Sequence, residues 1–74
     1  MKLSDIKIGQ KVKISGIDMS FDLAQRLVEL GFSVNTEVKA LIKGMGKSLT
    51  AYKVKNTVVA LRNETAYRIY VVLQ

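Results

Sequence analysis

The hydrophobic pattern changes its period along the chain and predicts several short strands and one helix. Residues 11–15 alternate lysine or serine with valine or isoleucine, which is typical of a strand with one buried face. Further along, Leu23, Leu27 and Leu30 recur at spacings of four and three residues, which predicts an amphipathic helix. Three more strands are predicted at residues 36–43, 48–54 and 57–62, followed by a helical turn at 63–66 and a last strand at 67–72.

The ends of these elements carry their own signals. Ser20 is a suitable N-cap for the helix, and Gly31 suits the left-handed position at which a helix stops. Phe32 is then expected to fold back against the last turn. A tight turn is expected near Asn56, which tolerates positive φ, and Asn63 is expected to cap the short helical turn.

The order of the elements predicts a mainly β fold. Five short strands, with one α-helix inserted after the first strand, favour a closed or nearly closed β-barrel in a chain of 74 residues. Closure would remove most of the exposed strand edges. We expect a single domain over residues 1–74, close to the lower size at which a hydrophobic core alone holds a fold.

Composition excludes several kinds of chemistry. The chain has no cysteine and no histidine, so it lacks disulfides and the usual ligands for zinc, copper and ferrous iron. The commonest general base and the best nucleophile are missing as well, so we expect neither an enzyme nor a bound metal or cofactor. The N-terminal segment has no apolar run of signal-peptide length and no stretch is long enough to span a membrane, which favours a cytoplasmic protein without membrane insertion.

The segment LIKGMGKS, residues 41–48, ends like a nucleotide-binding phosphate loop. Such a loop needs a glycine five residues before its Gly-Lys pair and a helix directly after it. Leu41 stands at the glycine position, and a strand is predicted after Ser48. The sequence therefore predicts a loop between two strands at this point and no phosphate site.

The positive charge is concentrated in one half of the chain. Twelve basic and six acidic residues give a net charge of +6, and the stretch between Val38 and Asn63 contains no acid. A surface of this kind attracts phosphates or an acidic partner, although it is also compatible with a solvated sheet face whose lysines discourage edge pairing. The basic residues of this stretch are Lys39, Lys43, Lys47, Lys53, Lys55 and Arg62.

The segments LSDIKIGQKVKISGI, RLVELGF, TEV and VALRNETAYRIYV, in this order and spacing, resemble the FeoA domain family nearly end to end. Members of that family usually have Pro-Gly before the first strand and after the helix, where this chain has Ile8-Gly9 and Val34-Asn35. Asn35 can still occupy a left-handed turn position. The resemblance is most readily checked at Arg26, Leu27, Leu30, Gly31, Ala60, Leu61, Ala66, Ile69 and Val71.

The resemblance implies a small SH3-like β-barrel that acts in bacterial ferrous iron uptake. Its implied protein partner is FeoB, a membrane permease with a cytosolic GTP-binding domain, and its implied role is to support transport. A similar domain forms the C-terminal part of some iron-dependent repressors, but that role requires a DNA-binding domain in addition.

Three functions remain open at the level of sequence. The first is docking on the cytosolic part of the permease and modulation of its transport or GTPase cycle. The second is binding of RNA or single-stranded DNA by a small basic β-barrel, which the charge favours and the scattered aromatic residues do not. The third, direct iron chaperoning, would need carboxylates to converge without imidazole or thiolate help. These carboxylates are Asp18, Asp22, Glu37 and Glu64.

Apolar residues outside the predicted core are candidate contact points for a partner. Met19 and Phe21 lie at the start of the helix, and Met45 lies between two glycines in the predicted loop. Alternatively, Phe21 closes one end of the core and Met45 is a lone surface residue. We expect Met45→Asp to weaken partner binding without affecting folding, and self-association stays open. The full set of candidate partner-binding residues is Met19, Phe21, Arg26, Lys43, Met45 and Lys47.

Overall fold

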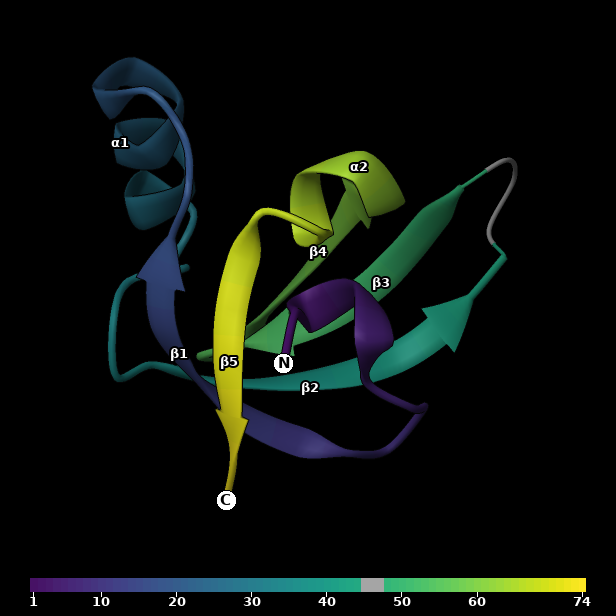
Figure 1. The fold of residues 1–74 in the computed structure, drawn as a ribbon. Helices are drawn as coiled ribbons and strands as arrows, with labels where there is room; N and C mark the ends of the chain where they lie inside the picture. Colours follow the sequence, from purple (N-terminus) through teal and green to yellow (C-terminus); the bar gives the residue numbers. More distant parts are fainter. Residues whose placement is uncertain (45–47) are drawn as a thin grey trace.

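The computed structural model describes residues 1–44 and 48–74 of the chain, which form one curved sheet and three short helical segments (Figure 1). The elements are the 3₁₀ helix η1 (Leu3–Asp5), β1 (Lys11–Ile17), α1 (Phe21–Glu29), β2 (Glu37–Lys43), β3 (Leu49–Val54), β4 (Thr57–Arg62), α2 (Asn63–Ala66) and β5 (Ile69–Leu73). The predicted mainly β fold with a helix after the first strand is confirmed.

All strand pairs are antiparallel, and the strand order is β4-β3-β2-β1-β5. Among the described residues, the outer strands β4 and β5 do not pair with each other, so the barrel is curved but not closed. The curvature has a local cause, because the strand register shifts between Ile14 and Gly16 and again between Ala40 and Ile42. Bulges of this kind bend a strand and increase its twist.

The alternating pattern of the strands places one row of side chains inside the curved sheet. Val12, Val38 and Val54 lie opposite one another on β1, β2 and β3, and all three are buried. Tyr52 lies in the same core, with its ring perpendicular to the ring of Phe32 at a centroid distance of 6.5 Å. The remaining core residues are Leu3, Ile6, Ile14, Leu27, Ala40, Leu61, Ala66, Ile69 and Val71.

The N-terminal segment covers part of the outer edge of β5. Lys2 forms an isolated antiparallel bridge with Tyr70, and the backbone N–H of Val71 donates a hydrogen bond to the carbonyl oxygen of Met1 at 2.8 Å. The Lys2 ammonium nitrogen lies 3.4 Å from the ring centroid of Tyr67, close enough for a cation–π interaction. Residues 1 and 2 therefore protect part of the β5 edge, one of the two strand edges that are exposed in an open barrel.

The C-terminal end of α1 is the one that the sequence predicts. Gly31 has φ +110°, and its N–H donates to the carbonyl of Val28 at 2.9 Å. The N–H of Phe32 donates to the carbonyl of Leu27 at 2.8 Å, which completes a Schellman ending and buries both side chains. Ser20 is the N-cap residue, as predicted, and its carbonyl oxygen accepts a hydrogen bond from the N–H of Ala24 at 2.9 Å, but its side chain makes no capping hydrogen bond.

The expected tight turn lies at Lys55 and Asn56, but the residue with positive φ and the cap of α2 each differ from the prediction by one position. The turn between β3 and β4 has its positive φ at Lys55 (+55°) and not at Asn56. Asn63 is the first residue of α2 and not its cap, and its side-chain oxygen accepts a hydrogen bond from the Thr50 hydroxyl at 3.2 Å. The expected left-handed conformation of Asn35 is confirmed by its φ of +71°.

Candidate protein-binding surface

Helix α1 leaves most of its apolar stripe uncovered. Of the three leucines that define the stripe, only Leu27 is buried, at 5 % exposure. Leu23 is 53 % exposed and Leu30 is similarly exposed, because α1 lies at one end of the molecule, beyond the curved sheet (Figure 1). Phe21, on the first turn, is 79 % exposed. The start of α1 is therefore an apolar surface that residues 1–44 and 48–74 leave uncovered.

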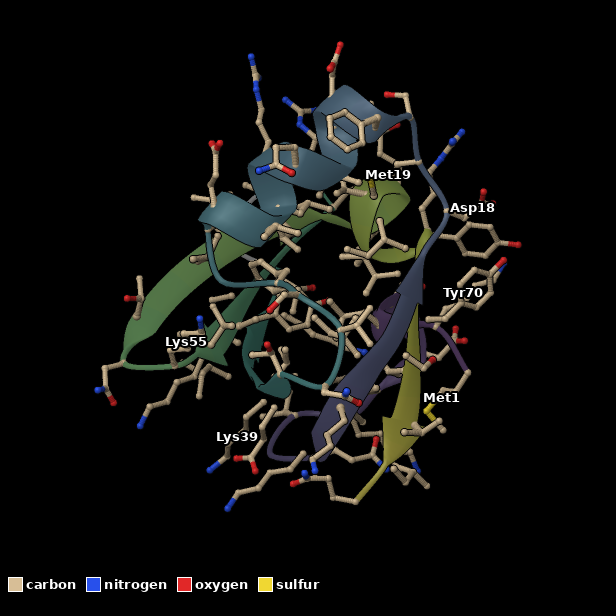
Figure 2. The ribbon with its side chains drawn as sticks, turned by 90° about the vertical axis from the view of Figure 1, so that its left-hand side faces the viewer. Met1, Asp18, Met19, Lys39, Lys55 and Tyr70 are labelled. Atoms are coloured by element: carbon tan, nitrogen blue, oxygen red, sulfur yellow. The ribbon has the colours of Figure 1, made fainter. Side chains whose placement is uncertain are left out.

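A groove of about 300 Å³ lies between the start of α1 and the short helix α2. Met19 and Leu23 line it from one side, and Glu64, Thr65 and Arg68 line it from the other. Figure 2 shows Met19 between the two helices, and its side chain also packs against the core. The groove thus combines two apolar side chains with one carboxylate, one hydroxyl and one guanidinium group. We call it the α1–α2 groove.

A second hollow, of about 250 Å³, lies beside α2. It is lined by Ser48, Arg62, Asn63 and Glu64. Glu64 lines both hollows, so the two form adjoining parts of one surface on either side of this residue. The second hollow is entirely polar in its lining residues, and it could accept hydrogen-bonding groups of a partner that fills the α1–α2 groove.

The structure separates the six predicted contact residues. Met19 lines the α1–α2 groove, while Phe21 and Arg26 are exposed on α1 without lining it. Lys43 is exposed at the end of β2 and lines neither hollow. Met45 and Lys47 lie outside the described residues. The effect expected of Met45→Asp therefore stays a prediction.

Four groove residues are not among the contact residues predicted from the sequence: Leu23, Glu64, Thr65 and Arg68. Leu23 belongs to the apolar stripe that predicts the helix, and periodicity alone does not reveal that this end of the stripe is exposed. Thr65 and Arg68 are about 40 positions away in the chain, so no local motif connects them with α1. The one available signal was the apolar pair Met19 and Phe21 ahead of the helical pattern.

The four carboxylates considered for iron lie on different elements. Asp18 precedes α1, Asp22 is on its first turn, Glu37 begins β2 and Glu64 is on α2. Within residues 1–44 and 48–74, no group of three or more His, Cys, Asp or Glu side chains is placed to hold a metal ion. None of the helices in this part of the chain is long and apolar enough to cross a membrane. The strand β3 begins directly after Ser48, which confirms that no phosphate-binding helix follows the Gly-Lys-Ser segment.

Comparison with known proteins identifies the family. The profile of the FeoA domain matches residues 1–73, almost the whole chain. The chain belongs to the FeoA domain family. A search of curated proteins by sequence finds no match to this FeoA-domain chain.

Solved structures agree with this assignment. FeoA of Stenotrophomonas maltophilia, solved with zinc and described as a prokaryotic SH3 domain protein, is 32 % identical with a TM-score of 0.83; the match covers 97 % of this chain and 89 % of that protein. The FeoA protein of Chlorobium tepidum is 23 % identical with a TM-score of 0.87, covering 99 % and 70 % of the two chains. The predicted SH3-like architecture and the association with ferrous iron transport are thus confirmed at the level of the family.

The same fold occurs in larger regulators. A manganese-dependent transcriptional repressor matches with a TM-score of 0.87 and 16 % identity, over 100 % of this chain and 41 % of its own. At this identity the similarity concerns the fold alone. It nevertheless means that the FeoA-like barrel is used both by itself and as part of longer chains.

Proposed function

We propose that this FeoA-domain chain is a cytoplasmic accessory protein of ferrous iron uptake that docks on the cytosolic part of a FeoB-type permease. Docking modulates the transport or the GTPase cycle of the permease, and the chain itself performs no catalysis. Family membership supports the link to ferrous iron transport. The Stenotrophomonas relative is itself described as a candidate ferrous iron transport activating factor.

The observation that carries the docking proposal is the uncovered start of α1 beside the α1–α2 groove. Exposed apolar surface rimmed by polar groups marks protein-binding sites. Here Phe21 and Leu23 are exposed next to a groove whose far wall carries Glu64 and Arg68. An apolar side chain of the permease can fill the groove between Met19 and Leu23, while the two charged residues bind polar groups at its rim.

The experiment is a calorimetric titration of the permease's cytosolic domain with this protein, in the nucleotide-free state and with GDP or a non-hydrolysable GTP analogue. The test variant is Leu23→Asp and the matched control is Ile8→Asp, since the two side chains are 53 % and 51 % exposed but only Leu23 lines the groove. We expect Leu23→Asp to weaken binding by about tenfold, equivalent to about 1.4 kcal/mol, because the charge must enter an apolar contact.

The control variant should retain the affinity of the unaltered protein within about twofold, because Ile8 lies in the loop before β1. Absence of binding in every nucleotide state would contradict the docking proposal. If both variants lose affinity equally, docking itself is retained, but the α1–α2 groove is not its site. GTP hydrolysis by the permease domain, measured with and without this protein, tests the modulation separately.

A further inference from the structure

Three lysines lie in one row across the centre of the sheet. The register pairs Lys11 of β1 with Lys39 of β2, and Lys39 with Lys53 of β3. Their neighbours Val12, Val38 and Val54 form the buried row, so alternation along each strand directs the three lysines to the outer face. We call Lys11, Lys39 and Lys53 the lysine row.

The lysine row is electrostatically unfavourable for the isolated protein. Like charges directly opposite each other on adjacent strands destabilise a sheet. The carboxylate of this part of the sheet, Glu37, stands opposite Lys13 in the neighbouring row and not opposite any member of the lysine row. Folding alone therefore does not favour lysine at these three positions.

Protection of strand edges does not account for the lysine row either. Lysines on an edge strand prevent pairing with other chains. The strand order is β4-β3-β2-β1-β5, so the lysine row lies on the three central strands and not on an edge. A ligand with negative charge would compensate the charge of the row.

Apolar residues border the lysine row and indicate the kind of ligand. Val58 of β4 lies opposite Lys53 and is 61 % exposed. Val72 of β5 lies opposite Lys13, next to the row, and is also exposed. We propose that the lysine row binds an extended acidic segment of a protein partner whose apolar side chains contact Val58 and Val72.

A nucleic acid fits this surface less well. Sequence-tolerant binding of single strands needs aromatic rings on which bases stack. Tyr67 and Tyr70 are engaged with Lys2, whose ammonium nitrogen lies 3.4 Å and 5.8 Å from their ring centroids. In the view of Figure 2, Lys39 also lies on the opposite side of the molecule from Tyr70. The charge of the row is therefore not accompanied by a stacking platform.

The test uses a fluorescently labelled peptide with a central run of glutamates flanked by valines, because strict alternation in an extended peptide would place the two residue types on opposite faces. The peptide is about ten residues long so that it spans the row, where strands lie about 4.8 Å apart. Binding is measured by fluorescence anisotropy at about 0.05 M and about 0.5 M salt. A labelled single-stranded oligonucleotide of similar length is measured in parallel. Lys53→Glu is the test variant and Lys7→Glu, in the loop before β1, is the control.

Both variants lower the net charge equally, since eleven basic and seven acidic residues give +4 in place of +6. We expect Lys53→Glu to weaken peptide binding by about tenfold at low salt and Lys7→Glu by less than about twofold, with both affinities reduced at high salt. Circular dichroism of both variants checks that the fold is retained.

Three results would overturn the inference: no binding of the peptide by the unaltered protein, equal losses in the two variants, or tighter binding of the oligonucleotide than of the peptide. The probe contains no permease sequence, so this outcome is independent of the docking proposed above. If the protein binds the permease domain but not the peptide, the role proposed for the lysine row is wrong, whereas the docking proposal is retained.

Discussion

Gly31 is the residue on which the end of α1 depends most directly. Its φ of +110° is unfavourable for other residues, and a Cβ at this position would lie 3.2 Å from Cγ2 of Val54. Gly9 has a similar φ of +85° but has no atom within 4 Å of such a Cβ. Comparing alanine at the two positions therefore separates backbone strain from a steric clash.

We expect Gly9→Ala to lower the free energy of unfolding by about 1 kcal/mol through the backbone alone. Gly31→Ala should cost about 1 kcal/mol more, because Val54 must also move within the core. Urea denaturation of the two variants measures both values. If the two variants lose the same free energy of unfolding, Val54 moves without cost, which would contradict the expected steric clash at Gly31.

The hydroxyl group of Tyr52 is buried and has no hydrogen-bond partner among the described residues. Burial raises the pKa of Tyr52 above its usual value of 10.0, so the unfolded chain loses this proton at lower pH than the folded protein does. The free energy of unfolding therefore does not depend on this proton below about pH 10, and it falls as the pH rises above the pKa of the unfolded chain.

Tyr52→Phe is expected to leave stability at neutral pH unchanged or to increase it by up to about 1 kcal/mol, because an unsatisfied polar group is removed. Above pH 10.0, the melting temperature of the unaltered protein should fall more steeply than that of the variant. Thermal denaturation across this range, monitored by circular dichroism, measures the difference. Parallel curves would show that the Tyr52 proton is not linked to folding.

At the scale of elements, the cross-strand register predicts that the centre of the sheet is not optimised for stability. Lys39 faces a lysine on each neighbouring strand, whereas Lys43 of the same strand lies opposite Thr50. Lys39→Glu turns two like-charge pairs into opposite-charge pairs and should raise the free energy of unfolding by about 0.5–1 kcal/mol at low salt.

Lys43→Glu is the matched control for this element, because it changes the net charge by the same amount without a lysine opposite. We expect its stability to stay within about 0.3 kcal/mol of the unaltered protein, and the gain from Lys39→Glu to shrink in high salt. A loss of stability in Lys39→Glu would contradict the electrostatic interpretation of the lysine row.

The existence and ends of α1 could be predicted from the sequence, whereas its exposed face could not. The Gly31-Phe32 ending depends on residues adjacent in the chain, and the structure contains both of its hydrogen bonds. The stripe of Leu23, Leu27 and Leu30 indicates a helix with an apolar face but not what covers that face. Of the three leucines only Leu27 is buried in the core, whereas Leu23 at the start and Leu30 at the end of the helix are exposed.

The strand bulges were equally invisible to the sequence pattern. Ser15 and Leu41 are the residues without a partner at the two register shifts, and both lie in segments whose sequence pattern predicts a regular strand. The positive φ of the turn before β4 fell on Lys55, although Asn56 is the better residue for it by itself. In both cases the pairing of the strands determines the backbone conformation, and the intrinsic preference of the single residue does not.

At the scale of the whole molecule, the sequence predicted the order of the elements and the family, but only Met19 among the residues of the candidate site. The strands β1 to β5 follow from periodicity and from turns that are local in the chain. The α1–α2 groove joins residues 19–23 with residues 64–68, and it exists only once the sheet has curved. In a domain this small, measuring 28 × 27 × 23 Å, a helix end can remain uncovered and available to a partner.

We propose above that the protein acts by docking a partner at the α1–α2 groove. The most direct test is a titration of the isotope-labelled protein with the unlabelled cytosolic domain of the permease, followed residue by residue in NMR spectra. We predict that the signals of Met19, Leu23, Thr65 and Arg68 shift or broaden as the complex forms. Spectra in which these four residues stay unchanged at saturation would contradict the claim.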